Sequence, residues 1–288
     1  MTQFNFDAIG TKWQIDLYKD LDKEKEVDIL SQIQSRIEIF DKTYSRFRSD
    51  SLVNKMSKKS GSFILPPDAE LMLSIYHDLY LRTGGLFTPL VGDMLSDAGY
   101  DSNYSLVQKK ELKASPLWED VLDYKHPNIL IKKPAMLDFG AAGKGYLVDL
   151  VSKVLESNNI YDYCIDAGGD MFYKGDNSIR VGLENPIDTS QVIGVCNLQN
   201  ASICGSAGNR RAWGKFTHIM NPKTHDSVRD VVAVWVVAKT ALVADALATC
   251  LFFVGAEDLS DFYDFEYVLI RSDSSVEKSK GFQGEIFT

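Results

Sequence analysis

Apolar positions in the first fifty residues predict a strand pair followed by an amphipathic helix. Residues 4–18 have the pattern of a strand pair, or of one long strand, interrupted at Gly10-Thr11. Asp22 is placed to cap the helix that follows. The apolar residues of that helix recur at helical spacing, so we expect them to face the core: Val27, Leu30, Ile33, Ile37 and Phe40.

Three later stretches also have the pattern of helices. The first begins after Pro66-Pro67-Asp68, reaches Arg82 and ends at the glycines that follow it. Its apolar side is predicted to consist of Leu71, Ile75 and Leu79. Another helix is expected to follow the turn that ends at Lys144 and to run to Leu155, and the last is expected over residues 240–253.

Short apolar runs separated by turn residues predict strands through the rest of the chain. They are residues 121–137 (two strands around His126-Pro127-Asn128), 161–165, 179–183, 192–198, 201–204, 231–238 and 266–271. Residues 97–120 have weak periodicity and are expected to form a peripheral excursion. Helices cluster between runs of strands, without a repeat or linker, which favours a single α+β domain over residues 1–288 with mixed or antiparallel sheets and packed helices.

Composition limits the function classes. The hydrophobic share is 45% and the charged share 25%, values of an ordinary globular protein. The formal net charge of -9 argues against a broad nucleic-acid surface, which needs clustered Lys and Arg. An anionic ligand would therefore need a local positive group or a metal ion.

Four cysteines occur, none with the C-x-x-C spacing of a zinc site. Three lie in apolar runs, which predicts buried free thiols in a reducing compartment, with a Cys196–Cys204 bridge as the alternative. No apolar run is long enough to predict a transmembrane helix. The first residues contain no signal core, so we expect a cytoplasmic location, although a trimmed export signal would leave the same start.

The central motif follows a predicted strand and begins a helix: Leu137-Asp138-Phe139-Gly140-Ala141-Ala142-Gly143-Lys144-Gly145-Tyr146. Its small residues let a ligand approach the backbone, and the helix start and Lys144 both favour an anion. The glycine spacing matches neither a Walker A loop nor a Rossmann fingerprint. The motif indicates a phosphate-bearing ligand, or else a tight turn with a solvated lysine.

Other polar residues stand in apolar or aromatic surroundings. Asp245 lies in an apolar helix with Thr249 on the same face, which suits a Mg²⁺ site unless Asp245 faces solvent. The aromatic and arginine residues of 44–51 could stack a planar ring or grip phosphate, or could form a capped turn. His218 is either a packed or surface histidine or a catalytic one.

Six blocks in order along nearly the whole chain resemble the ApbE-like FAD:protein FMN transferase family. The resemblance is carried by six blocks: Gly10-Thr11; Tyr44-Ser45-Arg46-Phe47 with Ser51 and Asn54; Gly85-Leu86-Phe87 with Val91-Gly92; the central motif through Asp149, followed by Ala167-Gly168-Gly169-Asp170; His218-Ile219-Met220-Asn221-Pro222-Lys223-Thr224; and Ala244-Asp245-Ala246-Leu247-Ala248-Thr249. The fold implied is a single ApbE-like domain.

The resemblance implies an enzyme that binds FAD, uses Mg²⁺ and transfers FMN to a Thr or Ser hydroxyl of an acceptor protein, releasing AMP. Carried over by position, the metal ligands are the Asp245 and Thr249 side chains and the Ala141 carbonyl, and His218 is the base for the acceptor hydroxyl. The residues implied to contact FAD are Ile9, Phe47, Leu86, Phe87, Thr88, Asp138, Lys144 and Ile219.

The sequence departs from the family pattern at several motif positions. Ile9 replaces Met, Thr88 replaces Asp, and Ala142-Gly143 replaces Ile-Ala. Asn221 and His225 replace Asp and Gly beside His218, where they could alter a turn and the choice of acceptor. Two alternatives use the same residues: an FAD pyrophosphatase that gives FMN and AMP, and a non-catalytic FAD-binding protein.

Overall fold

The computed structural model describes residues 1–287, and its centre is a sheet of eight strands in the order β1-β2-β6-β7-β10-β13-β14-β15. Every neighbouring pair in this sheet is antiparallel. The strands are β1 (Thr2–Ala8), β2 (Thr11–Leu17), β6 (Tyr163–Ala167), β7 (Asp170–Lys174), β10 (Ala201–Ala207), β13 (Val231–Ala238), β14 (Phe265–Arg271) and β15 (Val276–Lys278). The amino-terminal hairpin thus pairs directly with strands from the second half of the chain.

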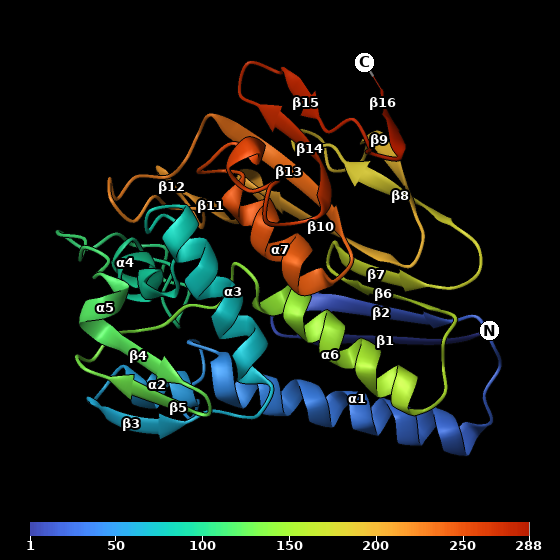
Figure 1. Ribbon diagram of the computed structural model, residues 1–288, viewed down its shortest axis with the longest axis horizontal. Coiled ribbons are helices and arrows are strands. Elements are labelled where there is room, and N and C mark those ends of the chain that lie inside the picture. Colours follow the sequence, from blue (N-terminus) through green and yellow to red (C-terminus); the bar gives the residue numbers. More distant parts are fainter. Residues whose placement is uncertain (288) are drawn as a thin grey trace.

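Helices cover one face of this sheet (Figure 1). They are α1 (Lys23–Tyr44), α6 (Gly143–Ser157), α7 (Ala241–Cys250) and α3 (Ala69–Arg82). Helix α6 packs between α1 and α7, α7 rests on β10 and β13, and α3 contacts α7. The main hydrophobic core lies between these helices and the sheet, with Ile33, Leu147 and Leu247 at or near 0% exposure.

A smaller sheet covers part of the opposite face. Its order is β16-β9-β8, with β8 (Ile179–Glu184), β9 (Val192–Leu198) and β16 (Gly284–Ile286). Side chains alternate between the faces of a strand. Accordingly Ile203 of β10 packs with Leu183 and Leu198 in a second core, whereas Cys204 belongs to the main core under the helices.

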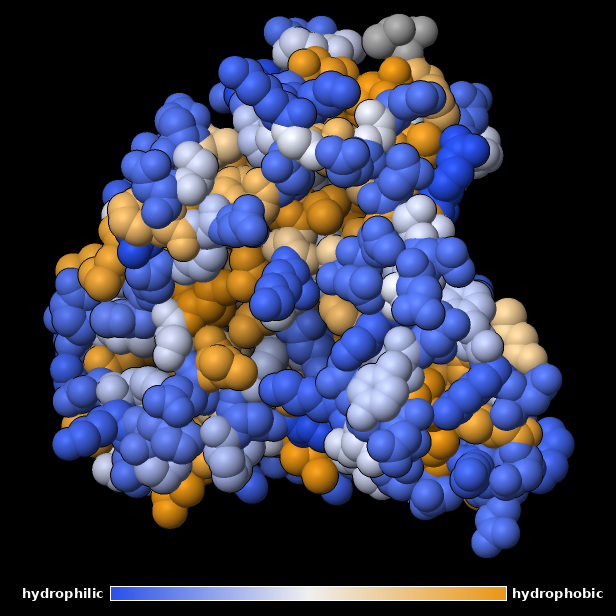
Figure 2. Space-filling view, turned by 45° about the vertical axis from the view of Figure 1, so that its right-hand side comes forward, coloured by the Kyte–Doolittle hydropathy of each residue, from blue (hydrophilic) through white to orange (hydrophobic). Residues whose placement is uncertain are grey.

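The remaining elements lie around the edge of these layers. They are α2 (Leu52–Met56), the sheet β3 (Gly61–Ile64), β5 (Asn128–Ile131) and β4 (Leu122–Lys125), the 3₁₀ helices η1 (Pro89–Val91), η2 (Gly208–Arg211) and η3 (Ala256–Asp258), the helices α4 (Gly92–Asp97) and α5 (Trp118–Val121), and the hairpin β11 (Ala212–Trp213) and β12 (Phe216–Thr217). Hydrophilic residues cover most of the face shown in Figure 2.

The structure confirms the α+β class with antiparallel sheets and packed helices. Two predicted core positions are wrong: Val27 is 68% exposed and Leu71 is 56% exposed. The buried stripe of α1 runs through Ile29, Ile33 and Ile37 instead, and Val27 lies outside it. In both helices one face packs on the core, and an apolar residue off that face remains in water.

The segment 97–120 is mostly exposed over residues 101–114, but its first four residues are buried, and one of them, Tyr100, lines the candidate site described below. The single-domain assignment over 1–288 stays a prediction. All four cysteines are buried free thiols, so the alternative Cys196–Cys204 bridge is absent. Within residues 1–287, no helix has both the length and the apolar character needed to cross a membrane.

Candidate functional site

The central motif forms a tight turn that leads into α6. Asp138 Oδ1 accepts a hydrogen bond of 2.7 Å from the Gly140 amide, and the Gly143 amide donates to the Phe139 carbonyl at 2.7 Å. The other carboxyl oxygen of Asp138 pairs with the Arg46 side chain. The turn is therefore held by its own backbone and by an arginine from the end of α1.

Gly145 allows the starts of α6 and α7 to touch. A Cβ at this position would lie 2.1 Å from the Ala241 carbonyl oxygen and 2.6 Å from Asp245 Cβ. The Gly145 amide donates to Asp245 Oδ2 at 2.8 Å. Asp149, one helical turn later, accepts from the amides of Ala241 and Leu242 at 2.8 and 2.9 Å, and so satisfies two donors at the start of α7 that have no partner within the helix. Helix α6 thus fixes the position of Asp245.

A second carboxylate enters from the β6–β7 hairpin. Gly168 and Gly169 both have positive φ, 63° and 95°, which a two-residue hairpin turn of type I′ requires at both of its central residues. The turn places Asp170 at 0% exposure, where it pairs with Lys144 Nζ. Two adjacent glycines after a predicted strand indicate a sharp turn or close contact with a ligand, and sequence reasoning assigned no role to Asp170.

The buried Asp245 and Asp170 and the half-buried Lys144 form a group with one more negative than positive charge when all are ionised. Burial, followed by repulsion from Asp170, raises the pKa of Asp245 to about 7. Burial opposes the charge of Lys144, but the two carboxylates outweigh it and raise the Lys144 pKa above its usual value. Asp245 is only 5% exposed, so the alternative that it faces solvent is wrong. Such a group needs a further cation or a proton.

The buried group opens into a cavity of about 320 Å³. The cavity brings together residues predicted from five separate blocks of sequence: Phe47, Leu86, Phe87, Thr88, Asp138, Ala141, Lys144, His218, Ile219, Asp245 and Thr249. Ile9, the remaining predicted residue, lines an adjoining cavity of about 350 Å³ that shares Phe47 and Lys144 with the first. A volume of this order is typical of sites for small organic ligands.

His218 lines the cavity with a neutral imidazole. Burial, followed by repulsion from Arg211, lowers its pKa from 6.5 to about 4. Its Nδ1 atom is buried and has no hydrogen-bond partner among the described residues. A neutral, unpaired imidazole can accept a proton from a hydroxyl.

The turn after His218 keeps its shape despite the two departures from the family pattern. Asn221 Oδ1 accepts from the amides of Lys223 and Thr224 at 2.9 and 3.2 Å, as an Asp carboxylate at this position could. His225 has a φ of 61°, the left-handed conformation that glycine adopts without steric cost. Asn221 therefore keeps the hydrogen bonds of the turn, and His225 keeps its backbone conformation at the cost of left-handed strain.

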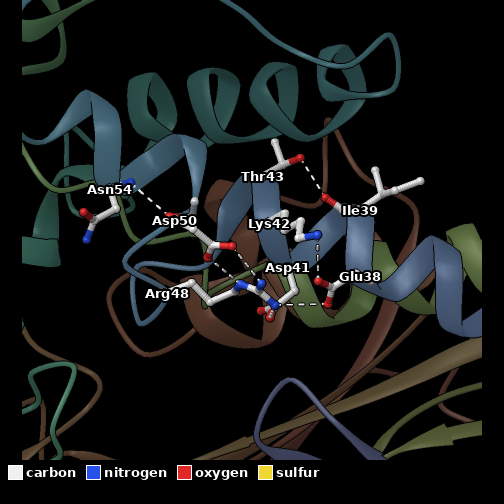
Figure 3. Close-up of polar contacts among 9 residues, drawn as sticks. Glu38, Ile39, Asp41, Lys42, Thr43, Arg48, Asp50 and Asn54 are labelled. Atoms are coloured by element: carbon white, nitrogen blue, oxygen red, sulfur yellow. Dashed lines mark hydrogen bonds and ion pairs between the residues drawn. The ribbon is translucent and has the colours of Figure 1, made fainter.

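The loop that carries Phe47 is attached to α1 by Arg48 (Figure 3). The Arg48 guanidinium donates to both carboxyl oxygens of Asp50, at 2.9 and 3.0 Å, and to Asp41 and Glu38 at 3.0 Å each. The planar guanidinium suits several carboxylates at once. Ser51 caps the next helix by accepting from the Asn54 amide, so the predicted capped turn is confirmed, close to Phe47 of the cavity lining.

The structure gives positioning partners to several residues whose partners sequence reasoning did not identify. Arg46 is 5% exposed, and its guanidinium carbon lies 4.2 Å from the Phe47 ring centroid and 4.8 Å from that of Tyr100. Asp149 and Asp170 appeared in the sequence analysis only as members of family motifs, with no role assigned to either. A buried arginine or aspartate has a detectable signal in an apolar stretch, as Asp149 has between Val148 and Leu150, whereas Arg46 and Asp170 lie in polar or turn-rich stretches.

The residues present fit a divalent cation. Asp170 Oδ1 is a buried oxygen without a hydrogen-bond partner among residues 1–287, and it lies beside the carboxyl group of Asp245. No group of three or more His, Cys, Asp or Glu side chains able to hold a metal occurs in that range. The predicted set has one carboxylate, one hydroxyl and one carbonyl, which suits Mg²⁺ because this ion keeps several waters.

Comparison with known proteins gives a consistent result. A family model described as the ApbE family matches residues 9–268. A protein of Rhodobacter capsulatus named FAD:protein FMN transferase is 31% identical in an alignment of 222 residues that covers 72% of this chain and 42% of that protein. A protein of Escherichia coli with the same name is 25% identical in an alignment of 273 residues that covers 87% of this chain and 77% of that protein.

Solved structures share the fold. The flavin transferase ApbE of Vibrio cholerae superimposes with a TM-score of 0.80 at 19% identity, covering 98% of this chain and 96% of that one. An ApbE protein of Thermotoga maritima gives a TM-score of 0.80 at 20% identity, covering 97% of both chains. At these identities the likeness concerns the fold.

Proposed function

The chain belongs to the ApbE family, and from this premise we propose that it is an FAD:protein FMN transferase that moves FMN onto a Thr or Ser hydroxyl of an acceptor protein and releases AMP. One observation carries the proposal. A single cavity gathers the buried carboxylate Asp245, the cation Lys144 and the neutral base His218. These are the groups that a phosphoryl transfer to a hydroxyl needs.

FAD would occupy the two adjoining cavities. Phe47 and Tyr100 offer aromatic faces for a planar ring, and the Leu86–Thr88 loop and Ile219 provide apolar walls. The backbone of the Asp138–Ala141 turn and the start of α6 favour the diphosphate. Lys144, although paired with Asp170, adds a positive charge at the same end of the helix.

Mg²⁺ would be held by the Asp245 carboxylate, the Thr249 hydroxyl and the Ala141 carbonyl, all of which line the cavity. When bound, it neutralises the diphosphate and polarises its oxygens. The Gly145 amide donates to Oδ2 of Asp245 and so orients the carboxylate, and Oδ1 does not take part in that hydrogen bond. Asp170 supports the site as the counter-charge of Lys144.

In the reaction, the acceptor hydroxyl oxygen attacks the phosphorus on the FMN side of the diphosphate. The new P–O bond makes a phosphoester, the bridging P–O bond breaks, and AMP leaves with the bridging oxygen. His218 accepts the hydroxyl proton. Its low pKa leaves it unprotonated at neutral pH, and a bound diphosphate would raise that pKa toward the working range because an anion favours the charged imidazole.

Two other functions use the same residues. With water as the acceptor, the enzyme would be an FAD pyrophosphatase that releases free FMN and AMP. Without turnover, the chain would be an FAD-binding protein. The family assignment favours transfer, and the fate of FMN separates the three.

Asp245→Asn tests the proposal, with Asp261→Asn as a matched control at an exposed site. Each protein is incubated with FAD with and without Mg²⁺, and AMP is measured by chromatography. We expect Mg²⁺-dependent AMP release to fall about 100-fold or more in Asp245→Asn, since loss of a ligand costs affinity and orientation together. Asp261→Asn should match the unmodified protein. Unchanged AMP release in Asp245→Asn would contradict the assignment.

A further inference from the structure

A second hollow lies on the opposite side of the large sheet and adjoins the candidate site. It has a volume of about 320 Å³ and lies between the outer face of the sheet and β8. Trp235, Ile203 and Met171 form its apolar base, and Val181 of β8 forms a wall. Trp235 is 9% exposed, so this aromatic ring is nearly covered and still accessible from the hollow.

The hollow, called the β8 groove from here on, meets the candidate cavity at the β6–β7 turn. Five residues line both spaces: Gly168, Gly205, Ser206, Ala207 and Arg210. Two of them are glycines and two are small, so the boundary between the two spaces is thin. A Cβ at Gly205 would lie 3.1 Å from the Trp235 ring, which shows how closely the base of the groove approaches β10.

Strand β8 offers an open edge along the groove. It is the last strand in the order β16-β9-β8, so one edge has no strand partner among residues 1–287. The strand ends at Glu184, whose carboxylate lies 3.1 Å from Arg210 Nη2 at the boundary with the cavity. An open edge accepts an extended chain through main-chain hydrogen bonds. A segment lying along β8 would therefore lead to the boundary residues.

We propose that the β8 groove binds the acceptor protein as an extended segment that lies along β8 and passes its Thr or Ser hydroxyl over the Gly168–Arg210 boundary into the cavity. This inference rests on the proposed transfer of FMN. The transfer needs a second substrate to reach the diphosphate from outside, and the groove shares five lining residues with the cavity. The apolar base of the groove sets the chemistry of the segment, which should place an apolar residue over Trp235.

The test uses peptides of about twelve residues, which span roughly 40 Å when extended. Each peptide has one Thr between Gly, Ala or Ser residues and one apolar residue at a varied distance. Val181→Glu places a charge in the apolar wall, and Met171→Glu does the same from β7. Val276→Glu on β15, at the far end of the large sheet, is the matched control at a 44% exposed site. Thermal melting checks that each variant is folded.

We expect Val181→Glu and Met171→Glu to raise the KM for the peptide at least tenfold, with the kcat, the Kd for FAD and the AMP release in water unchanged. Val276→Glu should leave all four quantities unchanged. An unchanged peptide KM in the folded groove variants would overturn the inference. A raised Kd for FAD would also overturn it, because the groove would then belong to the nucleotide.

Two further outcomes are decisive. If the unmodified protein is a dimer and Val181→Glu makes it monomeric, a second copy occupies the groove and the inference is wrong. If the unmodified protein releases AMP from FAD and labels no peptide, the proposed transfer fails and the inference fails with it, whereas a labelled peptide with an unchanged KM in the groove variants overturns the inference alone. Intact FAD in the presence of Mg²⁺ is a separate result, since it contradicts the proposed function itself.

Discussion

Gly145→Ala tests the contact between α6 and α7 that sets the position of Asp245. The added methyl would lie 2.1 Å from the Ala241 carbonyl oxygen and 2.6 Å from Asp245 Cβ. Carbon atoms in contact are about 3.5–4.0 Å apart, so α7 would have to move by roughly 1 Å. The clash is with the backbone of a neighbouring helix, which no rotamer change can relieve.

The magnitude follows from two opposing effects. Overpacking of a fitted contact costs about 1–3 kcal/mol. Alanine is more favourable than glycine inside a helix by about 1 kcal/mol. Because the obstacle is backbone, we expect the upper part of the first range and a net loss of about 2 kcal/mol in the free energy of unfolding. At about 2–4 °C per kcal/mol, the Tm should fall by roughly 4–8 °C.

Gly143→Ala is the matched control in the same helical turn. Its Cβ would meet Phe40 Cζ at 3.5 Å and Phe139 Cβ at 3.6 Å, which are ordinary contacts. We expect this variant to be as stable as the unmodified protein or slightly more stable. Differential scanning calorimetry gives the two Tm values, and Mg²⁺-dependent AMP release should fall about 100-fold in Gly145→Ala alone, since a 1 Å displacement of a ligand can cost that much. Equal stability and activity of the two variants would refute the reasoning.

Three other predictions concern the groups around the site. Asp149→Ala leaves the amides of Ala241 and Leu242 without their acceptor, and loss of such a cap costs up to about 2 kcal/mol. The urea midpoint of unfolding should therefore fall, with a smaller fall in Asp149→Asn. An unchanged midpoint would show that water replaces the carboxylate. His225→Gly should relieve left-handed backbone strain of about 1–2 kcal/mol. The flexibility of glycine in the unfolded chain offsets part of this gain, so the Tm should rise by about 1–2 °C. A lower Tm would argue against strain at this turn. The lowered pKa of His218 means that, as the pH falls from 6.5 to about 4, the unfolded chain gains a proton that the folded protein does not. Stability should therefore decrease over this range, and less so in His218→Gln; equal pH profiles in urea unfolding would contradict the shift.

Local pattern was sufficient for much of the fold. The alternation in residues 4–18 and the fully apolar run 231–238 each became strands of the large sheet, and the glycine pair after β6 became a tight hairpin turn. Asp245 was conspicuous because a carboxylate rarely stands inside a helix as apolar as α7. These features depend on neighbours in sequence, where periodicity and turn chemistry are directly visible.

Long-range contacts explain what could not be predicted. Arg46 and Asp138 pair across 92 positions, and Asp149 caps a helix that begins 92 residues later. Nothing in a local pattern shows which distant element an arginine or aspartate will meet. The same limit applies to Val27, whose apolar character gave no indication that it lies off the buried stripe of α1. The cytoplasmic location stays a prediction.

The transfer itself is tested most directly by mass spectrometry of an acceptor. The unmodified protein, FAD, Mg²⁺ and the threonine peptides described above are incubated together, beside the same peptides with Thr replaced by Ala. Transfer predicts that a threonine peptide gains the mass of FMN less one water, with one AMP released per peptide labelled, and that the alanine peptide gains nothing. Equal amounts of free FMN and AMP without a labelled peptide would contradict transfer and identify the protein as an FAD pyrophosphatase.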